Sequence, residues 1–65
     1  MWDDPEYLDD CLAIRDTDKG LLVQYEGEEV WLPKSKILED SEVTEVGDEG
    51  ILAIPRWLAE EKGLL

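Results

Sequence analysis

The chain has 65 residues, of which 18 are Asp or Glu and 6 are Lys or Arg, so its formal net charge is −12 at pH 7. This length allows one small domain, and a hydrophobic fraction of 43% with three tryptophans is too high for a disordered acidic segment. The sign of the charge opposes direct binding of nucleic acid, and the sequence lacks histidine, the commonest general base and metal ligand.

The first ten residues are acidic and contain few apolar side chains. Asp4-Pro5-Glu6 is typical of a helix start, with Asp as the N-cap and Pro at the first helical position. We therefore expect residues 1–10 to form an N-terminal arm or a short helix, which Trp2 could pack against the domain. Because a secretory leader begins with basic residues, the acidic start predicts a cytoplasmic protein.

Three short apolar segments, separated by turn residues, occupy the next part of the chain. We expect strands at Cys11–Arg15, Leu21–Tyr25 and Glu29–Leu32. Because the connections are short, these strands should pair in an antiparallel meander. Alternation along the third strand places Val30 and Leu32 on one face, and Glu29 and Trp31 on the other. Pro33 cannot donate to a strand ladder, so it ends this strand.

Two further strand signals follow a locally basic stretch. Glu42–Val46 alternates polar and apolar residues, which predicts a half-buried strand. Gly47–Gly50 has the composition of a hairpin loop. Ile51–Ile54 is a continuous apolar run and predicts the last strand.

A helix signal ends the chain. Pro55 occupies the first position of a predicted helix that continues over Arg56–Lys62. Gly63 follows as the C-cap. Trp57 and Leu58 should pack this helix onto the sheet, with Trp57 in the core.

Together these elements predict a mostly β protein with a C-terminal helix, of the α+β class. The expected architecture is a small curled antiparallel sheet of four or five strands, similar to an SH3 or OB fold. Residues 1–65 form a single acidic domain in this interpretation. Its parts are the arm or short helix at 1–10, the antiparallel sheet at 11–54 and the helix at 55–63.

Residues with catalytic or metal-binding chemistry are scarce. Cys11 is the only cysteine, so an internal disulfide is excluded, which fits a reducing compartment. Without a histidine partner, Cys11 is better explained as a small core residue than as a nucleophile. Asp16–Gly20 resembles a calcium loop in composition, but its glycine comes one place early and no glutamate occupies the twelfth position. We therefore expect no enzymatic activity, no cofactor and no metal site.

The carboxylates fall in clusters along the chain rather than in one tail. On a strand, acids two residues apart repeat about every 6.5 Å, which is close to the spacing of phosphates along a nucleic-acid strand. A rigid sheet bordered by such rows could present a phosphate-like array to a groove of Arg and Lys side chains. The candidate partner-binding residues are Glu26, Glu28, Glu29, Glu39, Asp40, Glu42, Glu45, Asp48 and Glu49. A secondary set comprises Asp16, Asp18 and Trp31.

Other interpretations of these residues stand beside mimicry. A run of acids is usually a solvated face that improves solubility, although a net charge of about 2–8 is sufficient for that purpose. Acidic surfaces with few lysines are also typical of adaptation to high salt. Trp31 shares a strand face with Glu29, which allows a different function: an accessory module of phage nucleic-acid metabolism that docks on its partner through Trp31. Binding of that kind would survive high salt.

Three segments resemble a group of small acidic proteins of phage and mobile-element origin. They are Trp31–Ile37, Val46–Gly50 and Ile54–Leu64, and the likeness extends over Ala13–Leu65. In size and charge, the chain also resembles anti-CRISPR proteins of the DNA-mimic kind. The resemblance implies a monomeric, non-enzymatic inhibitor that acts against host defence in the cytoplasm of a bacterial cell. Its expected partner is the basic surface with which a type I CRISPR surveillance complex reads target DNA and the short motif beside it.

Overall fold

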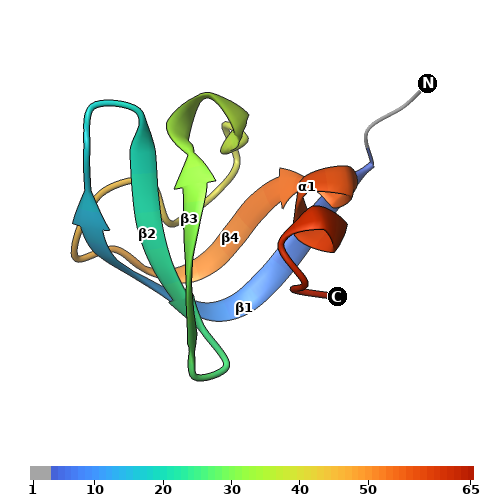
Figure 1. Ribbon diagram of the computed structural model, residues 1–65, viewed down its shortest axis with the longest axis horizontal. Coiled ribbons are helices and arrows are strands. Elements are labelled where there is room, and N and C mark those ends of the chain that lie inside the picture. The colour runs from blue at the N-terminus through green and yellow to red at the C-terminus, as the bar shows by residue number, and fades with distance from the viewer. Residues whose placement is uncertain (1–3) are drawn as a thin grey trace.

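The computed structural model describes residues 4–65. Its elements are the strands β1 (Pro5–Asp16), β2 (Gly20–Tyr25) and β3 (Glu28–Pro33), the 3-10 turn η1 (Lys34–Lys36), the strand β4 (Glu49–Pro55) and the helix α1 (Arg56–Glu61). The four strands form one antiparallel sheet in the order β3-β2-β1-β4 (Figure 1). The predicted α+β class, with a small antiparallel sheet and a short C-terminal helix, is confirmed.

β1 begins much earlier than the sequence predicts. For residues 5–10 the expectation of an arm or short helix is wrong, because the chain pairs with β4 from Pro5 onward. Leu8 lies opposite Leu52, and both side chains are buried. Pairing with a distant strand outweighs the local helix-start signal, since it satisfies backbone groups and buries Leu8 at the same time. Trp2 lies outside the described residues.

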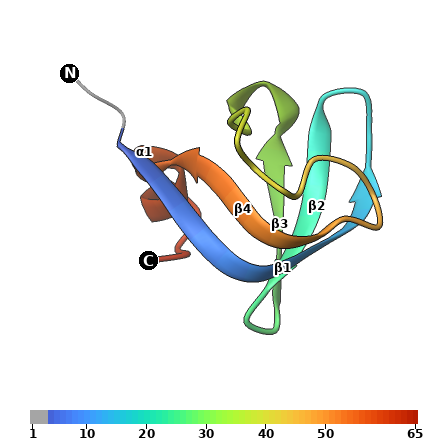
Figure 2. The same ribbon diagram turned by 180° about the vertical axis from the view of Figure 1, so that it is seen from behind.

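Two irregularities in β1 curl the sheet. The pairing with β4 shifts register between Leu8 and Cys11, and the pairing with β2 shifts between Ala13 and Arg15. Asp10, inside the first irregularity, has a φ of 58°. Extra residues of this kind bend a strand and increase its twist. Figure 2 shows β1 and β4 curving together across the molecule.

The β2–β3 hairpin is the most regular part of the fold. Its strands pair without a register shift, which confirms this part of the predicted meander. Glu26 and Gly27 connect them with φ values of 51° and 83°, as in a two-residue turn of type I′. As predicted, Leu32 is buried, whereas Glu29 and Trp31 are exposed on the opposite face.

The strand predicted at Glu42–Val46 is absent, and Gly47–Gly50 is therefore not a hairpin loop. Residues 37–48 instead form an irregular segment between η1 and β4. Val43 is buried as expected, but Val46 is 48% exposed. The alternating pattern predicted a strand, but in this segment side chains accept some of the hydrogen bonds from β4 that the backbone of a paired strand would accept.

This irregular segment covers the outer edge of β4. The Leu38 N–H donates to the Ala53 carbonyl at 2.9 Å, and the Glu42 N–H donates to the Ile51 carbonyl at 2.8 Å. In the reverse direction, the Ser41 hydroxyl accepts from the Ala53 N–H at 3.1 Å. The Glu42 carboxylate accepts from the Ile51 N–H at 3.0 Å. β4 therefore has hydrogen-bond partners along both of its edges.

α1 is one residue shorter than predicted at each end, because it spans Arg56–Glu61 with Lys62 as its C-cap and Gly63 just beyond. Pro55 belongs to the end of β4. Gly63 has a φ of 74°, and its N–H donates to the Glu60 carbonyl at 3.1 Å. The Leu64 N–H donates to the Ala59 carbonyl at 2.9 Å. These two bonds form the Schellman arrangement that glycine favours at a helix end.

Trp57 is not in the core, which corrects the prediction. Its side chain is 40% exposed, whereas Leu58 and Ala59 are buried. Successive helix residues point about 100° apart, so the inward direction of Leu58 turns Trp57 toward the surface. There the Lys36 ammonium lies 5.8 Å from the centroid of the Trp57 ring, within the range of a cation–π contact.

The core lies on the inner face of the curled sheet and is closed by α1 and Val43. Its buried residues are Leu8, Cys11, Ala13, Leu21, Val23, Leu32, Val43, Leu52, Ile54, Leu58 and Ala59. Cys11 is fully buried, which confirms its prediction as a core residue. Burial raises the pKa of the Cys11 thiol to about 11, because the thiolate would lose its solvation.

Candidate functional site

The described charges all lie at the surface, and few of them are paired. None of the charged side chains among residues 4–65 is buried. In that range, ion pairs join only Lys34 to Asp16, at 3.1 Å, and Arg56 to Glu60, at 3.5 Å. With 18 acids against 6 basic residues in the chain, most carboxylates have no cationic partner. The resulting negative potential is the principal chemical property of this surface.

The first group of candidate acids lies at the tip of the β2–β3 hairpin. Glu26 is in the turn, and Glu28 and Glu29 begin β3; all three are exposed. Figures 1 and 2 show this tip at the bottom of the molecule, away from the irregular segment between η1 and β4. The candidate acids at the hairpin tip and those of the irregular segment are therefore not brought together into one patch.

The second group of candidate acids divides into those that support the fold and those that do not. Glu39, Glu45 and Glu49 are exposed, and within residues 4–65 their carboxylates make neither an ion pair nor a side-chain hydrogen bond. The acids with structural contacts are Asp40, Glu42 and Asp48.

Asp40 links the irregular segment to β1. It accepts a hydrogen bond from the Tyr7 hydroxyl at 2.7 Å. This bond raises the pKa of Tyr7, because ionisation would break the bond and place two negative charges side by side. Asp40 is itself exposed, so the contact leaves it accessible to a partner.

Glu42 closes the edge of β4 and packs against a glycine. Besides its bond to the Ile51 N–H, its carboxylate lies over Gly50, where an added Cβ would be 2.5 Å from Oε1. Gly50 also has a φ of 142°, a conformation that is open mainly to glycine. Glu42 therefore serves the fold, and we expect it to contribute less to partner binding than an unbonded acid.

Asp48 stabilises the turn that precedes β4. Its Oδ2 accepts from the backbone N–H groups of Thr44 and Glu45 at 3.1 and 3.0 Å, and from the Thr44 hydroxyl at 3.2 Å. The backbone bonds favour the ionised carboxylate and lower the pKa of Asp48. The same turn is tied to β1, because the Gly47 N–H donates to the Ala13 carbonyl at 2.8 Å.

Strand register places two unbonded acids on one face of the sheet. Glu49 lies opposite Leu12 in β1. Gln24 in β2 then lies opposite Leu12 on one side and Glu29 on the other. Opposed residues point to the same side of a sheet, so Glu29 and Glu49 flank Leu12 and Gln24 on the outer face. Three strand spacings separate the two acids by roughly 14 Å along the sheet.

Trp31 is the largest exposed apolar group on this outer face. It is 45% exposed, and Leu22, directly opposite it in β2, is buried. Its ring packs beside Gly20, where an added Cβ would lie 3.3 Å from Trp31 Cε3. The predicted face shared by Trp31 and Glu29 is confirmed, and its use as a contact stays a prediction.

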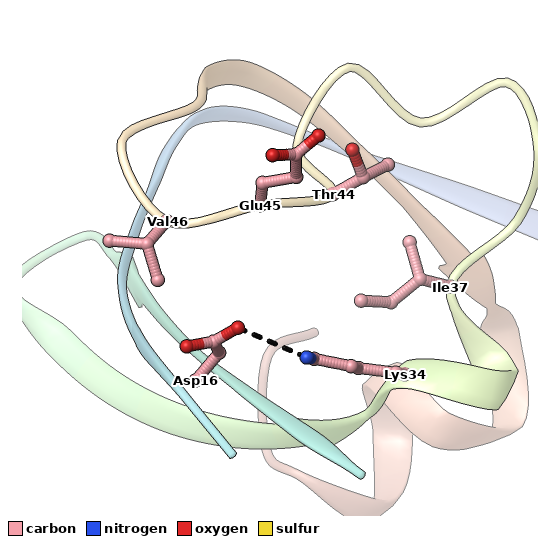
Figure 3. A pocket seen from close by; sticks show the side chains of 6 residues that line it. All are labelled: Asp16, Lys34, Ile37, Thr44, Glu45 and Val46. Atoms are coloured by element: carbon pink, nitrogen blue, oxygen red, sulfur yellow. Dashed lines mark hydrogen bonds and ion pairs between the residues drawn. The ribbon is translucent and has the colours of Figure 1, made fainter. Parts of the chain in front are cut away.

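Asp16 and Asp18 occupy different environments. Asp16 pairs with Lys34 beside a shallow pocket of about 340 Å³. Figure 3 shows Thr44 and Glu45 across this pocket from the ion pair. Asp18 is exposed in the β1–β2 turn. The ion pair partly neutralises Asp16, so Asp18 is the more available of the two.

Ser41 is the residue whose role sequence reasoning missed. Its hydroxyl accepts from the Val43 N–H at 3.2 Å and donates to the Val43 carbonyl at 2.9 Å. It also accepts from the Ala53 N–H at 3.1 Å. The tendency of serine to bond backbone groups nearby was a usable signal for the first contacts. No local signal indicates Ala53, which is 12 residues away.

Further observations describe the rest of the molecule and its relation to known proteins. Residues 4–65 contain no group of three or more Cys, Asp or Glu side chains placed to hold a metal ion. The helices described in that range lack the length and apolar character needed to span a bilayer. No protein-family model, curated protein or solved structure matches the chain. The function is therefore inferred from the surface itself.

Proposed function

We propose that this protein is an acidic DNA mimic that binds the basic DNA-reading surface of a type I CRISPR surveillance complex and blocks target DNA. The observation that carries the proposal is the unpaired acidity of a folded domain. The net charge is −12 on 65 residues, and none of the charges at residues 4–65 is buried. The resemblance in size and charge to anti-CRISPR proteins of the DNA-mimic kind suggests the choice of complex.

A folded acidic surface has an advantage over an acidic tail for this function. Glu28 and Glu29 are held by a regular hairpin, and Glu49 by the pairing of β4 with β1. Glu45 lies in a loop that Asp48 fixes. Carboxylates in fixed positions lose less conformational entropy on binding than those of a disordered chain, which must be ordered at that moment.

The attraction would resemble that between the partner and DNA. Arg and Lys side chains that normally hold phosphates form charge-assisted hydrogen bonds with carboxylates. Both surfaces release condensed or bound counterions, so affinity should fall steeply between about 50 and 200 mM salt. Inhibition follows because DNA and the protein compete for the same basic groove.

The direct test measures target-DNA binding by a purified type I surveillance complex in a mobility-shift assay with increasing amounts of this protein. We expect DNA to be displaced, more strongly at low salt, and the protein to migrate with the complex. A polyglutamate of the same net charge controls for unspecific acidity. Unchanged DNA binding at every protein concentration would show that the proposal is wrong.

Matched charge reversals then locate the interface. Each pair of substitutions alters the net charge equally, and the helix pair lies outside the candidate set. We expect inhibition to weaken about tenfold or more for the hairpin or loop pair, and less than about threefold for the helix pair. Equal losses for all three would indicate unspecific charge rather than mimicry. The three pairs are Glu28→Lys with Glu29→Lys, Glu39→Lys with Glu45→Lys, and Glu60→Lys with Glu61→Lys.

Trp31 supports a second candidate function, an accessory module of phage nucleic-acid metabolism. The supporting observation is its 45% exposure on the outer face of the sheet, since exposed tryptophans are frequent anchors of protein interfaces. Under this alternative, Trp31→Ala would abolish binding at high and low salt, and the acid reversals would have little effect. If added salt abolishes binding and Trp31→Ala does not, the accessory-module function is excluded.

A further inference from the structure

β3 is the outer strand at one end of the sheet, and its free edge has no partner within residues 4–65. The strand order leaves β3 paired only with β2. None of the hydrogen bonds found outside the strand ladders in that range involves residues 28–33. Glu28, Glu29, Trp31 and Pro33 are exposed. The outward backbone groups of β3 can therefore receive another strand.

The hairpin register identifies those outward groups. In a two-residue hairpin, the residues that flank the turn, here Tyr25 and Glu28, exchange both hydrogen bonds, and bonded pairs alternate from there. Because the register runs without a shift, the N–H and C=O groups of Glu29 and Trp31 point away from β2. Pro33 has no N–H, so it ends the usable edge.

We propose that this edge accepts an extended basic segment of the partner as an antiparallel added strand. The basic character of the segment rests on the proposed function. Glu29 and Trp31 use their outward backbone groups and share the outer face, so the residues opposite them would lie beside a carboxylate and an indole ring. Arginine suits both neighbours, because it pairs with carboxylates and stacks on tryptophan. Glu26 and Glu28 extend the negative charge toward the turn.

Charge selects a basic segment over a second copy of this chain. Two molecules with a net charge of −12 each repel one another. Charged residues on an edge strand and a proline at its end are typical protections against self-pairing. The same carboxylates attract a cationic strand. The edge therefore disfavours pairing with a second copy of this chain and favours pairing with the proposed partner.

The test uses capped eight-residue peptides that alternate Arg with Thr, titrated into the full chain and followed by tryptophan fluorescence. In the proposed pairing, Arg residues lie opposite Glu29 and Trp31, and their amides face β3. N-methylation of the Arg amides should therefore weaken binding about tenfold or more, because the strand ladder cannot form. N-methylation of the Thr amides, which face away, should change affinity by less than about twofold.

Each other outcome contradicts the added strand. If both methylated peptides bind alike, the edge is not the binding site, while a steep salt dependence would still support an acidic docking surface. If the unmethylated peptide does not bind at millimolar concentration, the added-strand proposal is also overturned. The mobility-shift assay decides the proposed function separately. A dimer of this protein in sedimentation experiments that the peptide does not dissociate would assign the edge to a second copy.

A matched pair of variants tests the same backbone group from the protein side. Glu29→Pro removes the outward N–H and the charge, and Glu29→Gln removes the charge alone. We expect the proline variant to bind the unmethylated peptide about tenfold more weakly than the glutamine variant. Equal affinities would overturn the proposal. Should Glu29→Pro fail to fold by circular dichroism, the peptide comparison decides alone.

Discussion

The two edges of this sheet are protected by different means. At β4, the segment at 37–43 supplies backbone donors, and Ser41 and Glu42 supply side-chain acceptors. At β3, no residue in the described range 4–65 covers the edge, which is bordered by Glu29 and ended by Pro33. The β4 edge is covered by hydrogen bonds. The β3 edge is protected from pairing by the charge of Glu29 and by the absence of an N–H at Pro33.

This difference shows that the carboxylates perform two kinds of work. Glu42 and Asp48 accept backbone hydrogen bonds and hold the chain in place. Glu28 and Glu29 are exposed, and their carboxylates make no hydrogen bond or ion pair within residues 4–65. Changes at the β4 edge should therefore alter stability, and changes at the β3 edge should alter association and binding.

The largest expected effect is at Gly50, beneath Glu42. Gly50→Ala should lower the free energy of unfolding by about 2–4 kcal/mol, because it combines backbone strain with displacement of the Glu42 carboxylate. Urea denaturation followed by tryptophan fluorescence measures this. Gly27→Ala is the control, since Gly27 has a φ of 83° but open space around it; its cost should be about 1–2 kcal/mol. Equal costs would mean that the Glu42 contact contributes nothing.

Ser41→Ala should have the next largest effect. It leaves the N–H of the buried Ala53 without an acceptor, which should cost about 1–3 kcal/mol. Ser35→Ala, at an exposed position in η1, should change stability by less than about 0.5 kcal/mol. Denaturation curves of the two variants that coincide would contradict the role assigned to Ser41.

A gain of stability is expected at the hairpin tip. Glu26→Asn should stabilise the protein by about 0.5–1 kcal/mol, because Asn-Gly fits a type I′ turn better than Glu-Gly. Glu26→Gln removes the same charge and keeps the strain, so it should not show this gain. A rise in Tm of similar size for both variants would attribute the effect to charge rather than to backbone conformation.

Neutralising the β3 edge should change association more than stability. Glu28→Thr with Glu29→Thr should leave the free energy of unfolding within about 0.5 kcal/mol, yet promote concentration-dependent self-association through the unguarded edge. Sedimentation velocity detects the change. Glu39→Thr with Glu45→Thr alters the net charge equally and should stay monomeric. A monomer in both cases would show that these acids do not guard the edge.

The smallest effect concerns pH. The pKa of Asp48 is lowered from its ordinary 3.8, so its ionised form stabilises the fold above that pH, and this contribution is lost as the pH falls through the lowered pKa. Asp48→Asn keeps an acceptor but no charge, so it should be slightly less stable than the wild type at pH 7. The difference in the free energy of unfolding between Asp48→Asn and the wild type should become smaller as the pH falls below the ordinary pKa of an aspartate. A constant difference from pH 7 to pH 2 would contradict this origin.

Local signals were sufficient for the hairpin and the helix end. β2 and β3 lie within one residue of their predicted bounds, because alternation along Glu29–Leu32 separates the apolar from the polar face. α1 ends within one residue of its predicted end, and Gly63 follows its C-cap, because few other residues adopt this positive φ at low cost. Both features depend on residues that are close together in the chain.

Long-range contacts explain the failures. The N-terminal half of β1 depends on β4, and the path of the segment at 37–48 depends on bonds to Ala53 and Ile51. The alternation at Glu42–Val46 is compatible with a strand. It is equally compatible with an irregular segment in which side chains accept the hydrogen bonds that a neighbouring strand's backbone would accept. Trp57 likewise has the character of a core residue, and only the docking of Leu58 turns it outward.

The sequence by itself determined the class of fold, the burial of Cys11 and an acidity strong enough to suggest a basic partner. Only the tertiary structure decided which carboxylates are free. The path of the chain after η1 brings the Ile51 amide to Glu42 and the Thr44 and Glu45 amides to Asp48, whereas Glu28 and Glu29 are exposed and unbonded in the described residues. The tertiary structure also decided which edge of the sheet stays open. Charge is a property of composition, whereas the availability of a charge depends on the hydrogen bonds that the fold brings to it.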